Sequence, residues 1–156
     1  MLARAGIRKL FVRASVALLL TASALAIAPS TANAVTCWGN YCSGKDPMSS
    51  GCASDAYTVA QAFPGWATID LRWSPTCKTN WARVYVYPTR TLAGGYITAR
   101  QDTGYIVSGQ IKSVTSLTPQ SQTVWSPMIY SPVRCVKAGA VLGMAYDWNY
   151  TWTRCV

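Results

Sequence analysis

The stretch ATIDLRWSPTCKTNWARVYVY, residues 67–87, decides the fold class of this chain. Its first seven residues alternate between apolar and polar side chains, which is the period-two pattern of a half-buried β-strand. Ser74-Pro75-Thr76 predicts a turn, and residues 81–87 (WARVYVY) predict a second strand that ends at Pro88. The segment therefore predicts a hairpin of two strands.

The same kind of pattern continues on both sides of this hairpin. Gly94-Gly95 and Asp102-Thr103-Gly104 separate runs rich in Val, Ile, Thr and Tyr, which favour strands. Further strands are predicted at 96–100, 105–113, 122–130, 133–137, 141–145 and 146–155. On the N-terminal side, Ser54-Asp55 predicts the cap of one short helix over 56–62. We expect a mainly β domain, a small antiparallel barrel or sandwich with one short N-terminal helix, stapled by disulfides.

Six cysteines accompany these strands, while the chain has no histidine and no C-x-x-C spacing. They are Cys37, Cys42, Cys52, Cys77, Cys135 and Cys155. An even number of cysteines in a short exported domain indicates a disulfide framework, whereas zinc sites usually contain histidine or C-x-x-C pairs. We predict Cys135–Cys155, whose closed loop of about 20 residues contributes roughly 3 kcal/mol. For the others we prefer Cys37–Cys52 with Cys42–Cys77, and we expect no metal and no cofactor.

Residues 1–34 are predicted to be a signal peptide. The segment starts with scattered basic residues, continues with a short apolar run at 14–26 (ASVALLLTASALA), and ends on Ala32-Asn33-Ala34, which matches a cleavage site. The apolar run is shorter than the roughly 20 residues that span a bilayer. We therefore expect one secreted domain, residues 35–156, with no membrane span after cleavage.

The charge of this mature domain is modest and scattered. Four of the 14 basic residues lie in the leader, which leaves ten basic and five acidic residues and a net charge of +5. The basic residues occur singly, whereas nucleic-acid surfaces usually cluster them. We expect no nucleic-acid partner and only weak attraction to anionic surfaces such as cell-wall polymers.

Four short motifs follow one another in the first half of the mature chain. They are YCSGKDP at 41–47, GCASDA at 51–56, LRWSPTC at 71–77 and NWARV at 80–84. Together they resemble a family of secreted actinobacterial domains of unknown function, in which C-x-G-x-D-P, G-C, L-R-aromatic-S-P-x-C and W-A-R recur in this order. The resemblance implies an extracytoplasmic location in a Gram-positive bacterium, and it implies no reaction, substrate or cofactor.

The residue types present argue against an enzyme. Without histidine, neither a Ser-His-Asp triad nor a Cys-His dyad can form, and oxidised cysteines supply no thiolate nucleophile. Glutamate is also absent, and the five aspartates suit turns, caps or ion pairs. We expect no catalytic residue. The alternative is a small secreted hydrolase, glycosidase-like, that uses two of Asp70, Asp102 and Asp147.

Aromatic residues are the main indication of function, because all seven Trp and all nine Tyr lie in the mature domain. Tyr146, Trp148, Tyr150 and Trp152 occupy every second position, so a strand would place these four rings on one face. The face is either outward, as a platform for sugar rings or a protein, or part of the core. We favour the core, since a small domain needs such rings for its own stability.

Arg72 and Arg83 lie on the two strands that flank the 74–77 turn. They either form a fork that binds carboxylate or phosphate, or they orient the hairpin through aspartates and aromatic rings; we favour the second role. A Cys42–Cys77 bond would bring the 44–47 loop and both arginines into one patch. We predict a secreted, non-catalytic module that binds cell-wall glycan or an extracellular protein. Its candidate binding residues are Arg72, Arg83, Trp81, Trp148 and Trp152.

Overall fold

The computed structural model describes residues 34–143 and 150–156, so residues 1–33 of the predicted signal peptide lie outside the described residues. The elements are the 3-10 helices η1 (Gly39–Cys42) and η2 (Cys52–Asp55) and the strands β1 (Tyr57–Ala62), β2 (Ala67–Ser74), β3 (Thr79–Leu92), β4 (Gly95–Gln101), β5 (Ile106–Ile111), β6 (Val114–Trp125), β7 (Ile129–Tyr130), β8 (Val136–Leu142) and β9 (Thr151–Trp152). None of the helices in these ranges is long and apolar enough to span a membrane.

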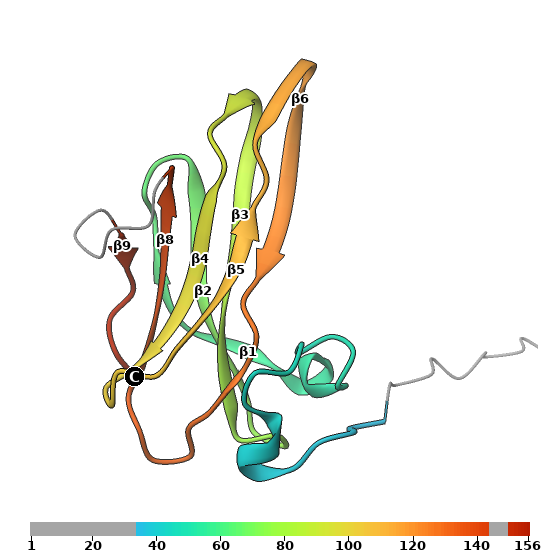
Figure 1. Ribbon diagram of the computed structural model, residues 1–156, viewed down its shortest axis with the longest axis vertical. Coiled ribbons are helices and arrows are strands. Elements are labelled where there is room, and N and C mark those ends of the chain that lie inside the picture. The colour runs from blue at the N-terminus through green and yellow to red at the C-terminus, as the bar shows by residue number, and fades with distance from the viewer. Residues whose placement is uncertain (1–33, 144–149) are drawn as a thin grey trace, which may run out of the picture. The chain divides into compact units, whose positions relative to one another are not determined.

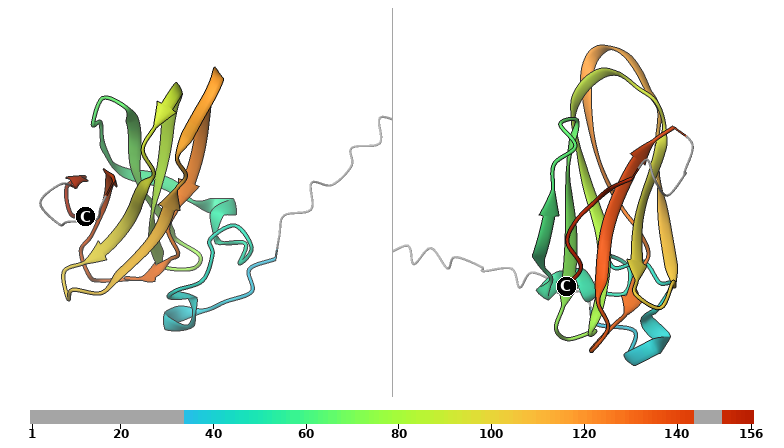
Figure 2. Two further views of the ribbon diagram at one scale, coloured as in Figure 1. Left: turned by 45° about the horizontal axis from the view of Figure 1, so that its top comes forward. Right: turned by 90° about the vertical axis from the view of Figure 1, so that its left-hand side faces the viewer.

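The strands form two antiparallel sheets (Figure 1). The first has the order β1-β2-β3-β6, with β7 paired to the start of β3, and the second has the order β5-β4-β8-β9. The segment that predicted a hairpin forms one, because β2 and β3 pair from Ala67↔Val86 to Ser74↔Thr79. The two sheets curl around a shared core, an arrangement between an open sandwich and half of a barrel (Figure 2). The prediction of a mainly β, antiparallel domain is confirmed.

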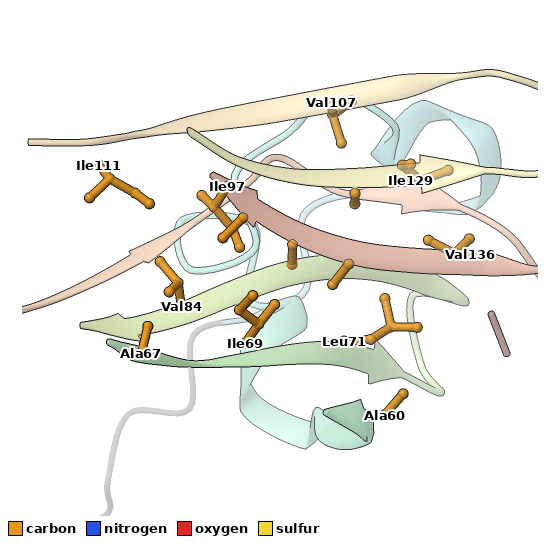
Figure 3. Packing of buried hydrophobic residues seen from close by; sticks show 14 of the residues in the cluster. Ala60, Ala67, Ile69, Leu71, Val84, Ile97, Val107, Ile111, Ile129 and Val136 are labelled. Carbon is orange, nitrogen blue, oxygen red and sulfur yellow. The ribbon is translucent and has the colours of Figure 1, made fainter. Parts of the chain in front are cut away.

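The core lies between the two sheets (Figure 3). Ile69 on β2 and its cross-strand neighbour Val84 on β3 are fully buried there. The second sheet contributes Ile97, Ala99, Val107, Ile111, Val136, Ala138 and Ala140. The residues between the core positions of β2 and β3, among them Asp70 and Arg83, lie on the outer face of the first sheet. The alternation in the sequence is therefore the alternation between the two faces of this sheet.

The predicted helix over 56–62 is wrong. The chain forms only the short η2 turn and then β1, an edge strand that pairs with β2 from Tyr57↔Trp73 onward. Tyr, Thr and Val at 57–59 favour a strand, and the neighbouring β2 supplies the hydrogen-bonding partner. Asp55 does not cap a helix. Its carboxylate accepts hydrogen bonds from Ser74 Oγ at 2.6 Å and from the Thr76 amide at 2.9 Å, so it caps the β2–β3 turn instead.

Several strand boundaries also differ from the prediction. β3 continues through Pro88. Its pairing with β2 ends at Val86, opposite Ala67, and its pairing with β6 shifts register between Val86 and Thr89. A proline, which has no amide hydrogen to donate, is therefore tolerated at position 88. The expected strand 122–130 is split between β6 and β7, and the expected strands 133–137 and 141–145 are replaced by the single strand β8. Of the strand expected at 146–155, residues 146–149 lie outside the described residues, and β9 covers Thr151–Trp152.

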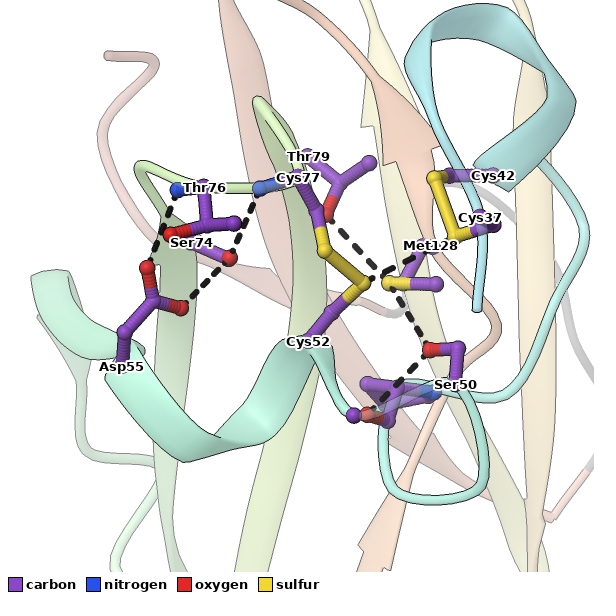
Figure 4. The surroundings of a disulfide bond; sticks show 12 residues. Cys37, Cys42, Ser50, Cys52, Asp55, Ser74, Thr76, Cys77, Thr79 and Met128 are labelled. Atoms are coloured by element: carbon purple, nitrogen blue, oxygen red, sulfur yellow. Dashed lines mark hydrogen bonds between the residues drawn. A yellow bond between two sulfur atoms is a disulfide. The ribbon is translucent and has the colours of Figure 1, made fainter. Parts of the chain in front are cut away.

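All six cysteines are described, and they form three disulfides: Cys37–Cys42, Cys52–Cys77 and Cys135–Cys155. The prediction of Cys135–Cys155 is confirmed, and the pairing Cys37–Cys52 with Cys42–Cys77 is wrong. The four N-terminal sulfur atoms lie within 4.8 Å of one another (Figure 4). Cys37 Sγ is only 3.7 Å from Cys52 Sγ, its predicted partner. Because the four sulfur atoms lie so close together, any of their pairings is nearly within reach, and the sequence alone gives little basis for choosing among them.

Candidate functional site

A cleft of about 440 Å³ opens at one end of the space between the two sheets. One wall consists of Tyr57, Trp73 and Asn80, which are neighbours across β1, β2 and β3. Trp73 lies two residues after the fully buried Leu71 and points to the same inner face of β2. Because Trp73 is near the end of the strand, it is only half-buried and lines the cleft. The Tyr57 side chain is 52% exposed. This wall therefore presents two aromatic rings and an amide.

The opposite wall is the segment 131–135, which connects β7 to β8. The Ser131 amide donates to Lys78 O at 3.0 Å, and Gln101 Nε2 donates to Ser131 Oγ at 3.0 Å. Cys135 joins this wall to Cys155 through a disulfide. The segment is thus fixed at both ends, and between them it presents the exposed side chains of Val133 and Arg134.

The cleft has the composition of a binding site for a small polar ligand. Binding sites in proteins are usually concave, of a few hundred Å³, and combine apolar surfaces with a few polar groups that set orientation. Here the apolar surfaces are the rings of Tyr57 and Trp73, and Arg134 adds a guanidinium with several donors. The rigid strands and the disulfide hold these groups without a ligand.

Arg83, a predicted site residue, forms an ion pair with the buried Asp70 on the outer face of the first sheet, where the Arg83 side chain itself is 39% exposed. Its Nε donates to Asp70 Oδ2 at 3.0 Å, and Gln61 Nε2 donates to Asp70 Oδ1 at 2.8 Å. Asp70 is only 4% exposed, so its charge depends on these partners. The structure therefore gives Arg83 a structural partner; its binding role stays a prediction.

Arg72 lies on the same outer face, and its contacts are also internal. It donates from Nη1 to Thr58 Oγ1 at 2.9 Å and from Nη2 to the Ala56 carbonyl oxygen. Burial lowers the pKa of Arg72, and the positive charge of Arg83 lowers it further. Arg72 thus fastens the start of β1 to β2, and the ion pair with Asp70 belongs to Arg83.

The 44–47 loop reaches the same face through Trp125, the cross-strand neighbour of Arg83. Trp125 Nε1 donates to Asp46 Oδ2 at 2.7 Å. Partial burial raises the pKa of Asp46, but hydrogen bonds from Ser49, Trp125 and Met48 outweigh this effect and hold it below its ordinary value. The loop and the two arginines therefore share one face, although no Cys42–Cys77 bond joins them.

Trp81 lies beneath the N-terminal block, by which we mean residues 35–56. It is 3% exposed and packs with Met128 against the four clustered cysteines, Cys37, Cys42, Cys52 and Cys77. Its surroundings are those of a core residue. A ligand could touch Trp81 only if the block moved away.

The remaining predicted site residues concern the second sheet. Trp148 lies outside the described residues, as does Tyr146. Trp152 lies opposite Gly139 and stacks on Tyr150, with 4.9 Å between the ring centroids, while Lys137 Nζ lies 4.3 Å from its ring centroid. Gly139 alternates with the core residues Ala138 and Ala140, so this pair of rings lies on the outer face. The expectation of core packing is wrong for Tyr150 and Trp152.

The predicted residues that the structure describes (Arg72, Arg83, Trp81 and Trp152) therefore occupy two separate outer faces, and the cleft is formed by others. Sequence reasoning missed Tyr57 because it was assigned to a helix, and Trp73 because it was treated only as one residue of a half-buried strand. Nothing in the sequence identified Arg134 as a site residue, because its place in the cleft depends on the path of the 131–135 segment between β7 and β8. The one available signal was the location of Trp73 directly before a turn, where an inward side chain lies at the end of a sheet.

The sequence of the chain matches the model of a family described as "Protein of unknown function (DUF2690)" over residues 40–139. The chain belongs to this family. Searches of curated proteins and of solved structures find no match. The DUF2690 segment contains Tyr57, Trp73, Asn80 and Arg134, whereas Trp148 and Trp152 lie beyond it. The resemblance seen in the four motifs is thus confirmed as membership of a family of cysteine-containing domains of unknown function.

Replacement of Arg83 with alanine is expected to destabilise the DUF2690 domain by about 2–4 kcal/mol, because it leaves the buried Asp70 carboxylate without its counterion. Urea denaturation followed by tryptophan fluorescence measures the change. Arg134→Ala is the matched control, since Arg134 is exposed, and it is expected to change stability by less than about 0.5 kcal/mol. Equal stability of the two variants would contradict a structural role for Arg83.

Proposed function

We propose that this chain is a secreted, non-catalytic module that binds a cell-wall glycan in the cleft between Trp73 and Arg134. The cleft carries the proposal, because it combines two aromatic rings, an amide and a guanidinium on walls that are already fixed. Three disulfides support an oxidising compartment outside the cytosol, which agrees with the predicted signal peptide.

The chemistry of the two walls suits a sugar polymer. The apolar faces of sugar rings pack against aromatic rings, and their hydroxyl or acidic groups accept hydrogen bonds from a guanidinium. The net charge of +5 on residues 35–156 adds a weak attraction to anionic wall polymers. An extracellular protein remains the second class of ligand, and the experiment below distinguishes it.

The alternative of a hydrolase with two aspartates has less support. Both carboxylate oxygens of Asp70 accept hydrogen bonds from other side chains on the outer face of the first sheet. Asp102 belongs to the turn between β4 and β5 in the second sheet. Asp147 lies outside the described residues. A carboxylate pair for glycoside hydrolysis needs two groups that flank one bond, and the contacts of Asp70 do not favour this role.

Replacement of Trp73 with alanine is expected to weaken retention on purified cell-wall glycan by tenfold or more, roughly the loss of one central aromatic contact. Co-sedimentation with the insoluble glycan gives the dissociation constant, and a melting curve confirms that the variant is folded. Trp152→Ala is the matched control, because it removes the same side chain from the outer face of the second sheet.

Arg134→Ala is expected to weaken retention less and to reduce its dependence on salt.

Unchanged binding by folded Trp73→Ala would refute the cleft as the site. Loss of binding by Trp152→Ala alone would place the ligand on the second sheet instead. A third outcome is that the unaltered protein is not retained on glycan but captures a wall protein that the Trp73→Ala variant fails to capture. This outcome would assign the cleft to a protein ligand.

A further inference from the structure

We propose that the four N-terminal cysteines form a tetrathiolate site for a soft divalent metal ion, such as Zn²⁺, when a dithiol has reduced their two disulfides. These residues are Cys37, Cys42, Cys52 and Cys77, and all are at most 1% exposed. Their four sulfur atoms lie within 4.8 Å of one another and form one group beside Met128 (Figure 4). This inference does not depend on the glycan-binding cleft, which lies elsewhere in the fold.

The spacing of the sulfur atoms suits tetrahedral coordination. A Zn–S bond of about 2.3 Å in a tetrahedron places the sulfur atoms about 3.8 Å apart. Cys37 Sγ and Cys52 Sγ, which belong to different disulfides, are already 3.7 Å apart. After reduction, the two bonded pairs have to separate to this distance, and the pairs that lie up to 4.8 Å apart have to approach to it. Such a move lies within the range of side-chain rotation and small shifts of the flanking loops.

Contacts that involve no sulfur atom hold each of the four segments in place. The Thr36 amide donates to Ser50 O at 3.0 Å, which fixes the chain beside Cys37. The Gly44 amide donates to Met128 O at 2.8 Å, which fixes the chain after Cys42. Asp55, three residues after Cys52, holds the β2–β3 turn that carries Cys77 (Figure 4). The sulfur atoms are therefore expected to stay together when the disulfides open.

The surroundings of the cluster also suit a metal–thiolate group. Trp81 and Met128 pack against the four sulfur atoms and exclude water. The main core of the two sheets contains none of these four cysteines, so reduction leaves it intact. The sequence alone does not predict this site: Cys37 and Cys42 have the C-x4-C spacing of some zinc ligands, but Cys52 and Cys77 lie far along the chain and join them only through the fold.

The chemistry balances with a dithiol as the reductant. Each dithiol gives two electrons and two protons to one disulfide, which becomes two thiols, and is itself oxidised to a cyclic disulfide. Two dithiols therefore yield four thiols. Binding of one divalent ion then releases four protons, because the ligands are thiolates. The metal ion would tie the N-terminal block to the β2–β3 turn in place of the Cys52–Cys77 disulfide, and it would replace the Cys37–Cys42 disulfide within the block.

Co²⁺ is a suitable probe, because its tetrahedral thiolate complexes absorb visible light while Zn²⁺ complexes do not. The protein is reduced with excess dithiol, freed of the reagent without oxygen, and titrated with Co²⁺. We expect thiolate–cobalt absorption that saturates at one ion per chain, and its loss when Zn²⁺ is added. The near-ultraviolet circular dichroism of the metal-bound protein is expected to match that of the oxidised protein.

Two variants locate the site. Cys52→Ser removes one ligand and is expected to abolish the tetrahedral absorption, whereas the double change Cys135→Ser and Cys155→Ser is expected to leave it unchanged. The proposal is overturned if no absorption appears, if the Cys135/Cys155 variant loses it, or if Co²⁺ binds without the native circular dichroism. In the last case an unfolded chain would hold the ion.

Discussion

Replacing Trp81 with alanine is expected to lower the free energy of unfolding by about 3–5 kcal/mol. The side chain is almost fully buried between the outer face of β3 and the cysteine cluster of the N-terminal block. Its removal would leave a cavity that cannot close fully, because the Cys52–Cys77 disulfide ties the N-terminal block to the β2–β3 turn. Urea denaturation gives the change in stability.

The control for this experiment is Trp38→Ala, which removes a tryptophan side chain from the N-terminal block itself. Trp38 is 68% exposed, so its loss is expected to cost less than about 0.5 kcal/mol. Similar losses in the two variants would contradict the packing role of Trp81. A stable Trp81→Ala protein that no longer binds glycan would instead support its predicted role as a binding residue.

Replacing Gly95 with alanine is expected to destabilise the second sheet by about 3 kcal/mol or more. Gly95 starts β4 and pairs with Ile111 on one side and Leu142 on the other. A Cβ atom at this position would overlap the carbonyl oxygen of Val141, which is backbone of the neighbouring strand and cannot rotate away. Two strands would have to shift for the methyl group to fit.

Gly94→Ala is the matched control for this second prediction. A Cβ atom on Gly94 would lie 3.1 Å from Ile111 O, a tight distance that a small adjustment relieves. We expect it to cost at most half as much as Gly95→Ala in the same thermal and urea unfolding experiments. An equal effect of the two substitutions would mean that steric overlap with β8 is not the cause.

The hairpin of β2 and β3 could be predicted because local alternation has a local cause. Successive residues of β2 face either the core or the outer face of the sheet, and the side-chain period alone reports this. The helix was mispredicted for the opposite reason. Ser54-Asp55 has the local form of a helix cap, but the groups that Asp55 binds are Ser74 and the Thr76 amide, about 20 residues further along the chain.

The candidate site was beyond prediction because its two walls depend on register and on loop position. Trp73 meets Tyr57 and Asn80 only through the pairing of three strands, and Arg134 joins them through the return of the 131–135 segment. The location of the aromatic pair Tyr150 and Trp152 was mispredicted for a related reason. Its spacing predicts one shared face, and the register opposite Gly139 decides that this face is the outer one.

The disulfide between Cys135 and Cys155 gives the chain a particular response to mechanical load. A pull on Val156 passes through this covalent bond to the start of β8, an interior strand of the second sheet, and therefore does not peel the edge strand β9 away. The enclosed segment, about 20 residues long, holds roughly 70 Å of extensible length that stays hidden until the bond is reduced. Under the glycan binding proposed above, tension would be borne as shear across whole strands, and reduction would turn the same terminus into a compliant tether.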